Sequence, residues 1–294
     1  MRQIYSRCIL IFYGLILLSS FLIFSINYFV DQFPGNNYFP ENALLIFLLL
    51  IFFNLGLRLC FEKNNKLCHM GLELLYFLCV MSAIALMTNA IQLTPFPVID
   101  SHIVRFEERI HINMISIIKW ADLYPQFKSL LWVIYNSLPN QMSIIPLLVI
   151  LTGRFHLLRE YYFFLLCTTL LGFLFYYFFP TTAPASIFDH SLFTSEQIAT
   201  GLKFQQIHQH INPTNNAGGL IALPSFHVIW ALLCVNLIRE WLIPFILLSI
   251  INILLIASCI LLGWHYCTDI IGSFVVLLIS YCLLKQCKKT KALS

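Results

Sequence analysis

Leu223-Pro224-Ser225-Phe226-His227 opens one apolar run of the sequence, and Gly263-Trp264-His265-Tyr266-Cys267-Thr268-Asp269 opens the next. In the second stretch His265 and Asp269 are four residues apart, so on a helix they share a face. The carboxylate can then accept the N–H of one imidazole nitrogen, which leaves the other nitrogen free to act. The second stretch therefore predicts the start of a helix that carries a reactive histidine.

The first stretch places His227 shortly after Pro224 and Ser225. A proline beside a small polar residue is typical of a helix start, and an anion can sit on the backbone N–H groups of such a turn. Each stretch leads into a run of about 17 apolar residues, the length that a helix needs to cross the hydrocarbon core of a membrane. Both histidines are thus expected at the ends of membrane helices.

The composition agrees with a chain built from such helices. Of the 294 residues, 60% are apolar and 10% are charged, whereas about 25% of residues are charged in a typical soluble domain. We therefore expect an all-α, polytopic membrane helix bundle. Residues 94–129 and 180–223 each span only about 40 residues, too few for an independent domain. The expected partners are the membrane and its lipids; no nucleic acid is expected, and the oligomeric state is left open.

About eight membrane spans are predicted. The first is expected to be retained, because no small-residue cleavage site follows its basic leader. Residues 1–93 hold the N-terminal spans, 94–129 form an interfacial segment on the extracytoplasmic side, and 130–294 hold the remaining spans. Pro139 and Pro146 interrupt the fourth span. The predicted spans are 9–30, 43–59, 72–93, 130–151, 161–179, 224–240, 244–263 and 267–284.

The distribution of basic residues predicts the orientation in the membrane. With eight spans both termini lie on one side, and that side receives all but five of the 17 lysines and arginines. Cytoplasmic loops carry an excess of these residues, so both termini are expected to be cytoplasmic. The two histidine stretches and both ends of loop 180–223 then meet on the extracytoplasmic side. The five basic residues on that side are Arg105, Arg109, Lys119, Lys128 and Lys203.

Residues 100–120 are too polar to span a membrane but show helical periodicity. The pattern predicts one helix, which either lies on the outer membrane surface or packs over the bundle. The spacing alone does not distinguish these two arrangements. Its recurring apolar positions are Ile103, Phe106, Ile110, Met114 and Ile117.

Two motifs together resemble those of the type 2 phosphatidic acid phosphatase superfamily, which contains membrane phosphatases and phosphotransferases and the soluble vanadium haloperoxidases. Residues 224–227 resemble its P-S-x-H motif, and residues 258–269 resemble its S-R-x5-H-x3-D motif. The likeness covers about residues 130–284 and implies a six-helix catalytic core. Two features depart from the pattern. Cys259 stands where the family has an arginine that grips phosphate, and no K-x6-R-P motif precedes Pro184.

The chain looks most similar to the branch that contains inositol phosphorylceramide synthase. That branch is similar in having a proline-rich stretch, here Pro180 to Pro184, and an apolar residue, here Phe226, between the serine and the histidine. The approach from Gly218 to Leu223 also looks like that branch. The resemblance implies phosphotransfer from or to a lipid at the extracytoplasmic face, with hydrolysis as the close alternative.

The resemblance also implies roles for the motif residues. His265 would attack phosphorus and become a phosphohistidine, with Asp269 holding its tautomer. His227 would protonate the leaving oxygen and later deprotonate the incoming alcohol or water. Ser225 would hold the phosphoryl oxygens together with the turn that Pro224 and Phe226 flank. No cofactor and no metal ion enter this scheme.

Other groups are needed in place of the two missing family cations. Lys203 is the only basic residue of loop 180–223, although lysines of this kind are usually solvated. Thr181 and Thr182 can donate hydrogen bonds to phosphate, although turn capping explains them equally well.

Two other classes of protein stay open. In a transporter or channel, His227, His265 and Asp269 would form a proton relay. In a metalloenzyme the same three residues would bind zinc.

Overall fold

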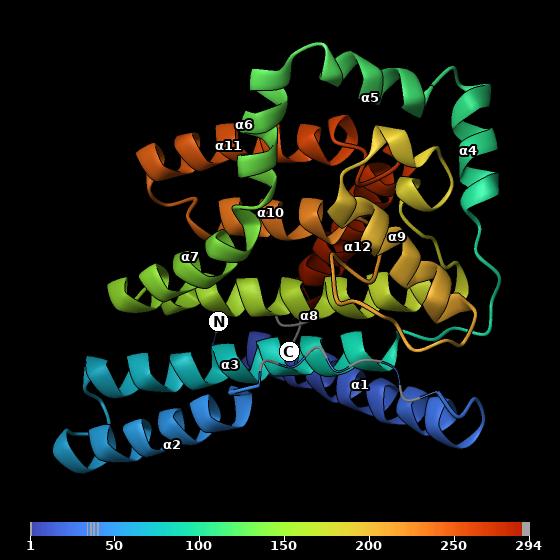
Figure 1. The fold of residues 1–294 in the computed structure, drawn as a ribbon. Helices are drawn as coiled ribbons and strands as arrows, with labels where there is room; N and C mark the ends of the chain where they lie inside the picture. Colours follow the sequence, from blue (N-terminus) through green and yellow to red (C-terminus); the bar gives the residue numbers. More distant parts are fainter. Residues whose placement is uncertain (1, 34, 36, 38, 40, 290–294) are drawn as a thin grey trace.

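The structure is a computed structural model that describes residues 2–33, 35, 37, 39 and 41–289, and within these residues all regular structure is helical (Figure 1). Six helices are long and apolar enough to cross a membrane. This confirms the all-α membrane bundle that the sequence predicts. The six are α1 (Arg2–Phe29), α2 (Ala43–Cys60), α3 (Lys66–Ala90), α8 (Phe155–Phe178), α11 (Leu242–Leu261) and α12 (Cys267–Lys289).

The predicted count of eight spans is not confirmed, because two predicted spans have a different form. The fourth is a pair of helices, α6 (Pro125–Tyr135) and α7 (Leu138–Thr152), which meet at a bend of 44° and count as a seventh span only if they are taken together. Pro139 lies in the first turn of α7, where its missing N–H costs no helical hydrogen bond. The sixth is α10 (Phe226–Leu237), which is apolar but has only 12 residues.

Helix α8 forms the centre of the bundle. It packs against α1 and α3 on one side and against α7, α10 and α12 on the other. Many of its aromatic side chains are buried, including Tyr161, Tyr162 and Phe163. A helix that is apolar all round belongs in the interior of a bundle. In Figure 1, α1, α2 and α3 form a layer below α8, while α6, α7, α10 and α11 lie above it.

The two termini lie at the same end of the bundle. The thiol of Cys8 in α1 is 2.9 Å from the thiol of Cys287 in α12. Ion pairs gather at this end of α8, including Arg154 with Glu240 and Arg239 with Glu160. We call it the charged end. The first residues of α10 and α12 lie at the other end, which we call the site end, on the right in Figure 1.

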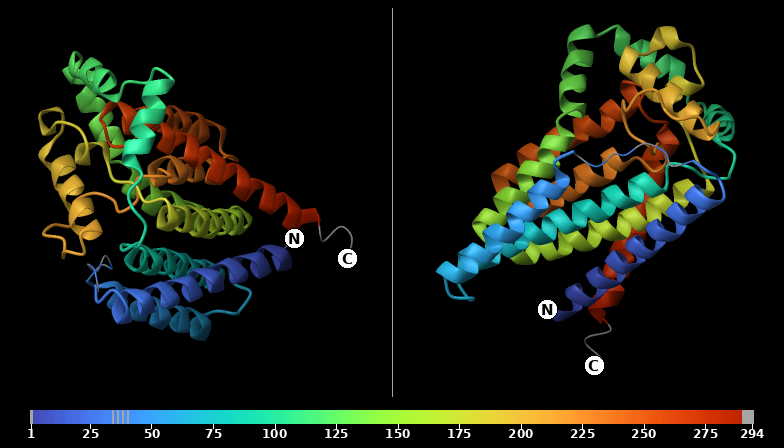
Figure 2. Two further views of the ribbon diagram at one scale, coloured as in Figure 1. Left: turned by 90° about the vertical axis from the view of Figure 1, so that its right-hand side faces the viewer. Right: turned by 60° about the horizontal axis from the view of Figure 1, so that its bottom comes forward.

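Residues 100–120 form two helices rather than the single helix that the periodicity predicts. Helix α4 (Asp100–Arg109) ends before His111, whose φ of 63° breaks the helical path, and α5 (Met114–Asp122) follows. Phe106 and Ile110 are exposed. The two helices arch over the site end of the bundle (Figure 2).

Loop 180–223 covers the site end from the other side. It contains two short 3-10 helices, η1 (Pro184–Ser186) and η2 (His190–Leu192), and the helix α9 (Ser195–His208). Thr194 caps α9, because its side chain accepts from the backbone N–H of Gln197 while the Gln197 side chain accepts from Thr194 in return. Such a reciprocal pair fixes where a helix begins.

Candidate active site

The starts of α10 and α12 are joined by hydrogen bonds. The backbone N–H of Ser225, which precedes α10, donates to the backbone oxygen of Asp269 over 3.3 Å. The hydroxyl of Ser273 in α12 donates to the Ser225 oxygen over 2.9 Å. These bonds fix the positions of the two motif stretches relative to each other.

Two glycines let neighbouring helices approach the start of α10. A Cβ at Gly172 of α8 would lie 2.7 Å from the Phe226 ring and 3.1 Å from Pro224. A Cβ at Gly272 of α12 would lie 2.7 Å from the Leu223 side chain. Cβ atoms almost never approach another atom this closely, so a larger residue at either position would force its neighbours to move. Pro224 therefore lies between α8 and α12 at points where both helices have a glycine.

His265 lies in the connection between α11 and α12 and faces Asp269, as their spacing predicts. Its Nδ1 is 3.1 Å from Oδ2 of Asp269, and the same oxygen accepts the backbone N–H of Tyr266 over 3.0 Å. The imidazole is 5% exposed and also lies near the backbone carbonyl of Ala222. Burial lowers the pKa of His265 to about 4, because a desolvated charge is costly. The imidazole is therefore neutral at neutral pH, as a nucleophile must be.

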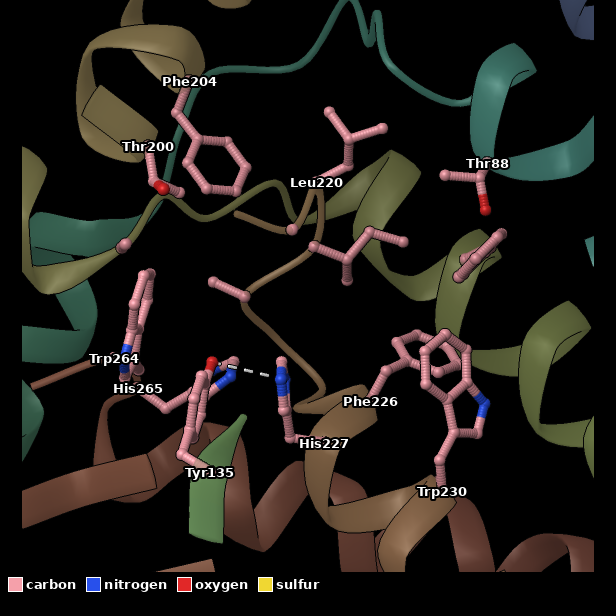
Figure 3. A pocket seen from close by; sticks show the side chains of 15 residues that line it. Thr88, Tyr135, Thr200, Phe204, Leu220, Phe226, His227, Trp230, Trp264 and His265 are labelled. Carbon is pink, nitrogen blue, oxygen red and sulfur yellow. Dashed lines mark hydrogen bonds between the residues drawn. The ribbon is translucent and has the colours of Figure 1, made fainter. Parts of the chain in front are cut away.

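His227 lies in the first turn of α10, with its ring centroid 5.9 Å from that of His265. The phenol ring of Tyr135, from the end of α6, stacks on it at 4.3 Å. The Tyr135 hydroxyl is 3.4 Å from Nδ1 of His227 (Figure 3). Trp264 stacks on the opposite face of Tyr135 at 5.2 Å. The two histidines thus face each other beside a stack of aromatic rings.

Both histidines line a cavity of about 160 Å³. Its wall comes from α3, α6, α8, α9 and α10, and from the segment 219–222. No lysine, arginine, aspartate or glutamate is among its described lining residues, so its ionisable side chains are the two histidines and Tyr135. The other lining residues are Thr88, Phe173, Ala183, Thr200, Phe204, Gly219, Leu220, Ile221, Ala222, Phe226, Trp230 and Trp264.

Phe226 is the only predicted substrate-binding residue that lines the cavity. Pro224 and Ser225 are buried behind it, and the Ser225 hydroxyl lies beside the thiol of Cys259. This cysteine occupies the place of the family arginine, so a neutral group stands where the family has a cation.

The two threonines at the start of loop 180–223 form hydrogen bonds that hold neighbouring segments of the chain in place. The Thr181 hydroxyl accepts the backbone N–H of Leu223 over 3.0 Å. Thr182 donates to Asp100 through its backbone N–H and its hydroxyl. Both threonines are buried and do not line the cavity.

Lys203 is buried in α9 and does not line the cavity either. Its ammonium donates to the backbone oxygens of Ala217 and Gly218, over 2.5 and 3.1 Å. Burial lowers the pKa of Lys203 to about 8. The contacts of Lys203 hold the segment that leads into the cavity wall at Gly219.

Helix α4 contributes two buried carboxylates that the sequence analysis did not identify as part of the site. Asp100 accepts the hydroxyl of Tyr266 over 3.1 Å, in addition to its bonds from Thr182. Burial raises the pKa of Asp100, and the hydrogen bonds that it accepts oppose this shift. Glu107 accepts from the backbone N–H and hydroxyl of Thr268, over 2.7 and 2.9 Å. A carboxylate at a helix N-terminus is favourable, so Glu107 fixes the start of α12.

A signal for this pair was present in the sequence. Asp100, Ile103 and Glu107 share one helical face, and all three are buried. Tyr135 was missed as well, and an aromatic residue near the end of an apolar run carries no comparable signal. In the described part of the chain, no three histidine, cysteine or acidic side chains are placed to hold a metal ion.

Comparisons with known proteins agree with the motifs. The family model described as PAP2 superfamily matches residues 101–283, more than half of the chain. No curated protein and no solved structure matches. The match confirms the predicted superfamily and does not distinguish the inositol phosphorylceramide synthase branch within it. With both histidine motifs at one cavity and the match covering them, the chain belongs to the PAP2 superfamily.

Proposed function

We propose that this protein is a lipid phosphotransferase or phosphatase that works through a phosphohistidine. Its substrate would be a phospholipid or lipid phosphate. The observation that carries the proposal is the pairing of His265 with Asp269, opposite His227, at the wall of one cavity. Membership of the superfamily supports the same class of reaction.

In the first step Nε2 of His265 attacks phosphorus, and the bond from phosphorus to the leaving alcohol breaks. His227 donates a proton to the departing oxygen. Asp269 accepts the Nδ1–H of His265, holds the ring tautomer and favours the positive charge that develops on the imidazole. The products of this step are a free alcohol and a phosphoenzyme.

In the second step His227 removes a proton from an incoming alcohol or water. The acceptor oxygen bonds to phosphorus, the phosphorus–nitrogen bond breaks, and its electron pair returns to His265. An alcohol acceptor gives transfer and water gives hydrolysis. Lipid profiling of membranes with and without the protein separates the two: loss of a lipid that bears a head group indicates transfer, and accumulation of a phosphomonoester indicates hydrolysis.

We propose that the site faces the extracytoplasmic side. The excess of basic residues on the side of the termini supports this orientation. The arginines of the charged end, Arg154, Arg159 and Arg239, also lie away from the two histidines.

We propose that the reaction needs no metal ion, because the nucleophile and the acid are both side chains. The purified protein should therefore retain its activity on lipid phosphates in excess chelator. Complete loss of activity that added zinc restores would instead make His227, His265 and Asp269 a metal site.

The decisive experiment is to trap the phosphoenzyme. The substrates are a natural lipid donor and nitrophenyl phosphate, whose leaving group needs little protonation. His265→Ala should give no acid-labile phosphoenzyme from either. His227→Ala should still be labelled by nitrophenyl phosphate but not turn over the lipid. His156→Ala, an exposed histidine at the charged end, is the matched control.

The outcome of this experiment also assigns the two histidines. Labelling that survives in His265→Ala and disappears in His227→Ala would show that their roles are exchanged. If the lipid profile does not change and solute uptake does, the transporter alternative is favoured instead.

A further inference from the structure

We propose that the donor lipid is a zwitterionic phosphodiester whose head group carries an alkylammonium, as in a phosphocholine ester. This inference rests on the proposed function and specifies its substrate. Three properties of the cavity support it: its size, its aromatic wall and its charge.

The size of the cavity fits a head group. A volume of about 160 Å³ is similar to that of an engineered cavity of about 150 Å³ that holds benzene. A group of this bulk enters, whereas an acyl chain does not. The acyl chains would therefore stay in the bilayer while the head group and its phosphate enter beside His227 and His265.

The wall of the cavity is unusually aromatic. The lining includes Tyr135, Phe173, Phe204, Phe226, Trp230 and Trp264. The ring centroid of Phe226 lies 4.9 Å from that of Phe173 and 5.1 Å from that of Trp230, and Figure 3 shows Phe226 and Trp230 side by side. Aromatic faces attract cations, and cages of such rings bind quaternary ammonium groups. An alkylammonium is therefore the head group that this wall recognises best.

The charges around the cavity disfavour a more anionic donor. None of its described lining residues is a lysine or arginine, and the Lys203 ammonium is directed to backbone oxygens. Asp100, Glu107 and Asp269 are buried behind the catalytic connection. A phosphomonoester carries a charge of about −1.5 to −2 at neutral pH and would meet no cation here. A zwitterion has no net charge, and its ammonium accompanies the phosphate into the cavity.

The polar groups of the wall offer a polyol head group few partners: the unpartnered donors among the described lining side chains are the indole N–H groups of Trp230 and Trp264. The aliphatic hydroxyls of the wall belong to Thr88 and Thr200, and each already donates to a backbone oxygen of its own helix over 2.8 Å. Buried hydroxyls without hydrogen-bond partners are unfavourable. An ammonium without hydroxyl groups avoids this cost.

The test compares three donors with the same two acyl chains, presented to the full chain in mixed micelles. The first is the phosphocholine ester. The second is its 3,3-dimethylbutyl ester, which replaces the charged nitrogen by carbon and keeps the shape. The third is the phosphomonoester. We expect kcat/KM for the choline ester to exceed that for each of the others by about tenfold or more, since one cation–π contact contributes about 0.5–2 kcal/mol and several rings line the cavity.

Equal or better turnover of the dimethylbutyl ester or the phosphomonoester would overturn this inference. So would labelling of His265 by nitrophenyl phosphate with no labelling by the choline ester, a result that would leave the proposed function standing. If His265 is labelled by none of these compounds, the proposed function itself fails.

A tryptophan variant tests the wall directly. Trp230→Leu should lower kcat/KM for the choline ester more than kcat/KM for the dimethylbutyl ester, so that the preference largely disappears. Trp230→Phe should keep most of the preference, and Trp120→Leu, at an exposed position of α5, should keep all of it. An equal loss with both donors in Trp230→Leu would mean that the ring only fills space, and would overturn its proposed role.

Discussion

The phenol ring of Tyr135 lies almost parallel to the imidazole of His227, with the ring centroids 4.3 Å apart and the planes 15° apart. Its hydroxyl reaches Nδ1 of the same histidine. The stacked ring favours a positive charge on His227, and the hydroxyl oxygen can accept the Nδ1–H. We therefore expect Tyr135 to position His227 for its proposed role as the general acid.

Tyr135→Phe separates these two effects, because it keeps the ring and removes the hydroxyl. A hydrogen bond contributes about 1 kcal/mol, so we expect turnover of the natural donor to fall about five- to tenfold. The rate of phosphoenzyme formation from nitrophenyl phosphate should be unchanged, because its leaving group needs no acid. Tyr135→Leu should lower turnover of the natural donor further. An equal fall with both substrates in Tyr135→Phe would exclude a role through His227.

The two buried carboxylates of α4 predict a different response. Asp100→Asn leaves at least one of its buried donors without an acceptor, and we expect it to destabilise the fold by about 1–3 kcal/mol. Glu107→Gln weakens the favourable charge at the start of α12 and should cost about 1 kcal/mol. Thermal unfolding in detergent measures both. Glu108→Gln, at an exposed neighbouring position of α4, should have no effect, and a fall as large as that of Glu107→Gln would contradict the role of Glu107.

Gly172 and Gly272 predict a graded effect of alanine. At Gly172 the new Cβ would meet the ring of Phe226, which is held in the cavity wall; at Gly272 it would meet the flexible end of Leu223. We expect Gly172→Ala to destabilise the protein by about 1–3 kcal/mol and to lower turnover, and Gly272→Ala to cost less. Gly14→Ala has open space around it and should be neutral or slightly stabilising. Equal unfolding temperatures for all three variants would contradict the close packing.

The environment of His265 predicts the acid limb of the pH profile. Burial lowers the pKa of His265 from its usual 6.5 to about 4, so the neutral nucleophile persists well below pH 6. With nitrophenyl phosphate, kcat/KM should stay level down to about pH 5 and fall below it. The contribution of this group to stability is present above pH 6.5 and is lost as the pH falls from 6.5 towards 4. An acid limb centred near pH 6.5 would contradict the burial of the imidazole.

The orientation in the membrane can be tested with single cysteines, in a background from which the native cysteines have been removed. Asn212→Cys, at the site end, should react with a thiol reagent that cannot cross the membrane. Lys285→Cys, near the charged end, should react only after the membrane is opened. Both positions are exposed, so access to the reagent decides the result. The reverse pattern would place the catalytic chemistry in the cytoplasm.

The fold class could be predicted from the sequence because the length of an apolar run is a local property of the chain. Six helices lie where long apolar runs occur. The pairing of His265 with Asp269 was predicted from helical spacing, and the structure has this pair although His265 lies just before α12 rather than within it. The span predicted at 224–240 is not confirmed, because α10 covers only Phe226–Leu237 and the apolar run ends at Arg239. Composition does not indicate where a helix inside the bundle ends. Because protein rather than lipid surrounds such a helix, its length need not match the thickness of the membrane.

The hydrogen bonds that Asp100 and Glu107 of α4 make around the site could not be predicted from local spacing. Asp100 bonds to residues 82 and 166 positions away, and Glu107 bonds to Thr268 at a distance of 161 positions. Only the fold brings these groups together. The apolar periodicity of residues 100–120 does not predict these bonds either, because the buried face of α4 consists of Asp100 and Glu107 together with Ile103.

The shortness of α10 has a consequence for the depth at which we expect the proposed chemistry to take place in the bilayer. Twelve residues rise about 18 Å, whereas the hydrocarbon core is about 30 Å thick. Because α10 ends beside the ion pairs of Arg239 and Glu240, we expect His227 to lie below the opposite membrane surface. At that depth bulk water is scarce, and membrane-dissolved alcohols are concentrated. We therefore expect the phosphoenzyme to react with a lipid alcohol more often than with water. The depth of the site in the bilayer, rather than a side chain that distinguishes alcohol from water, would then protect the phosphoenzyme from hydrolysis.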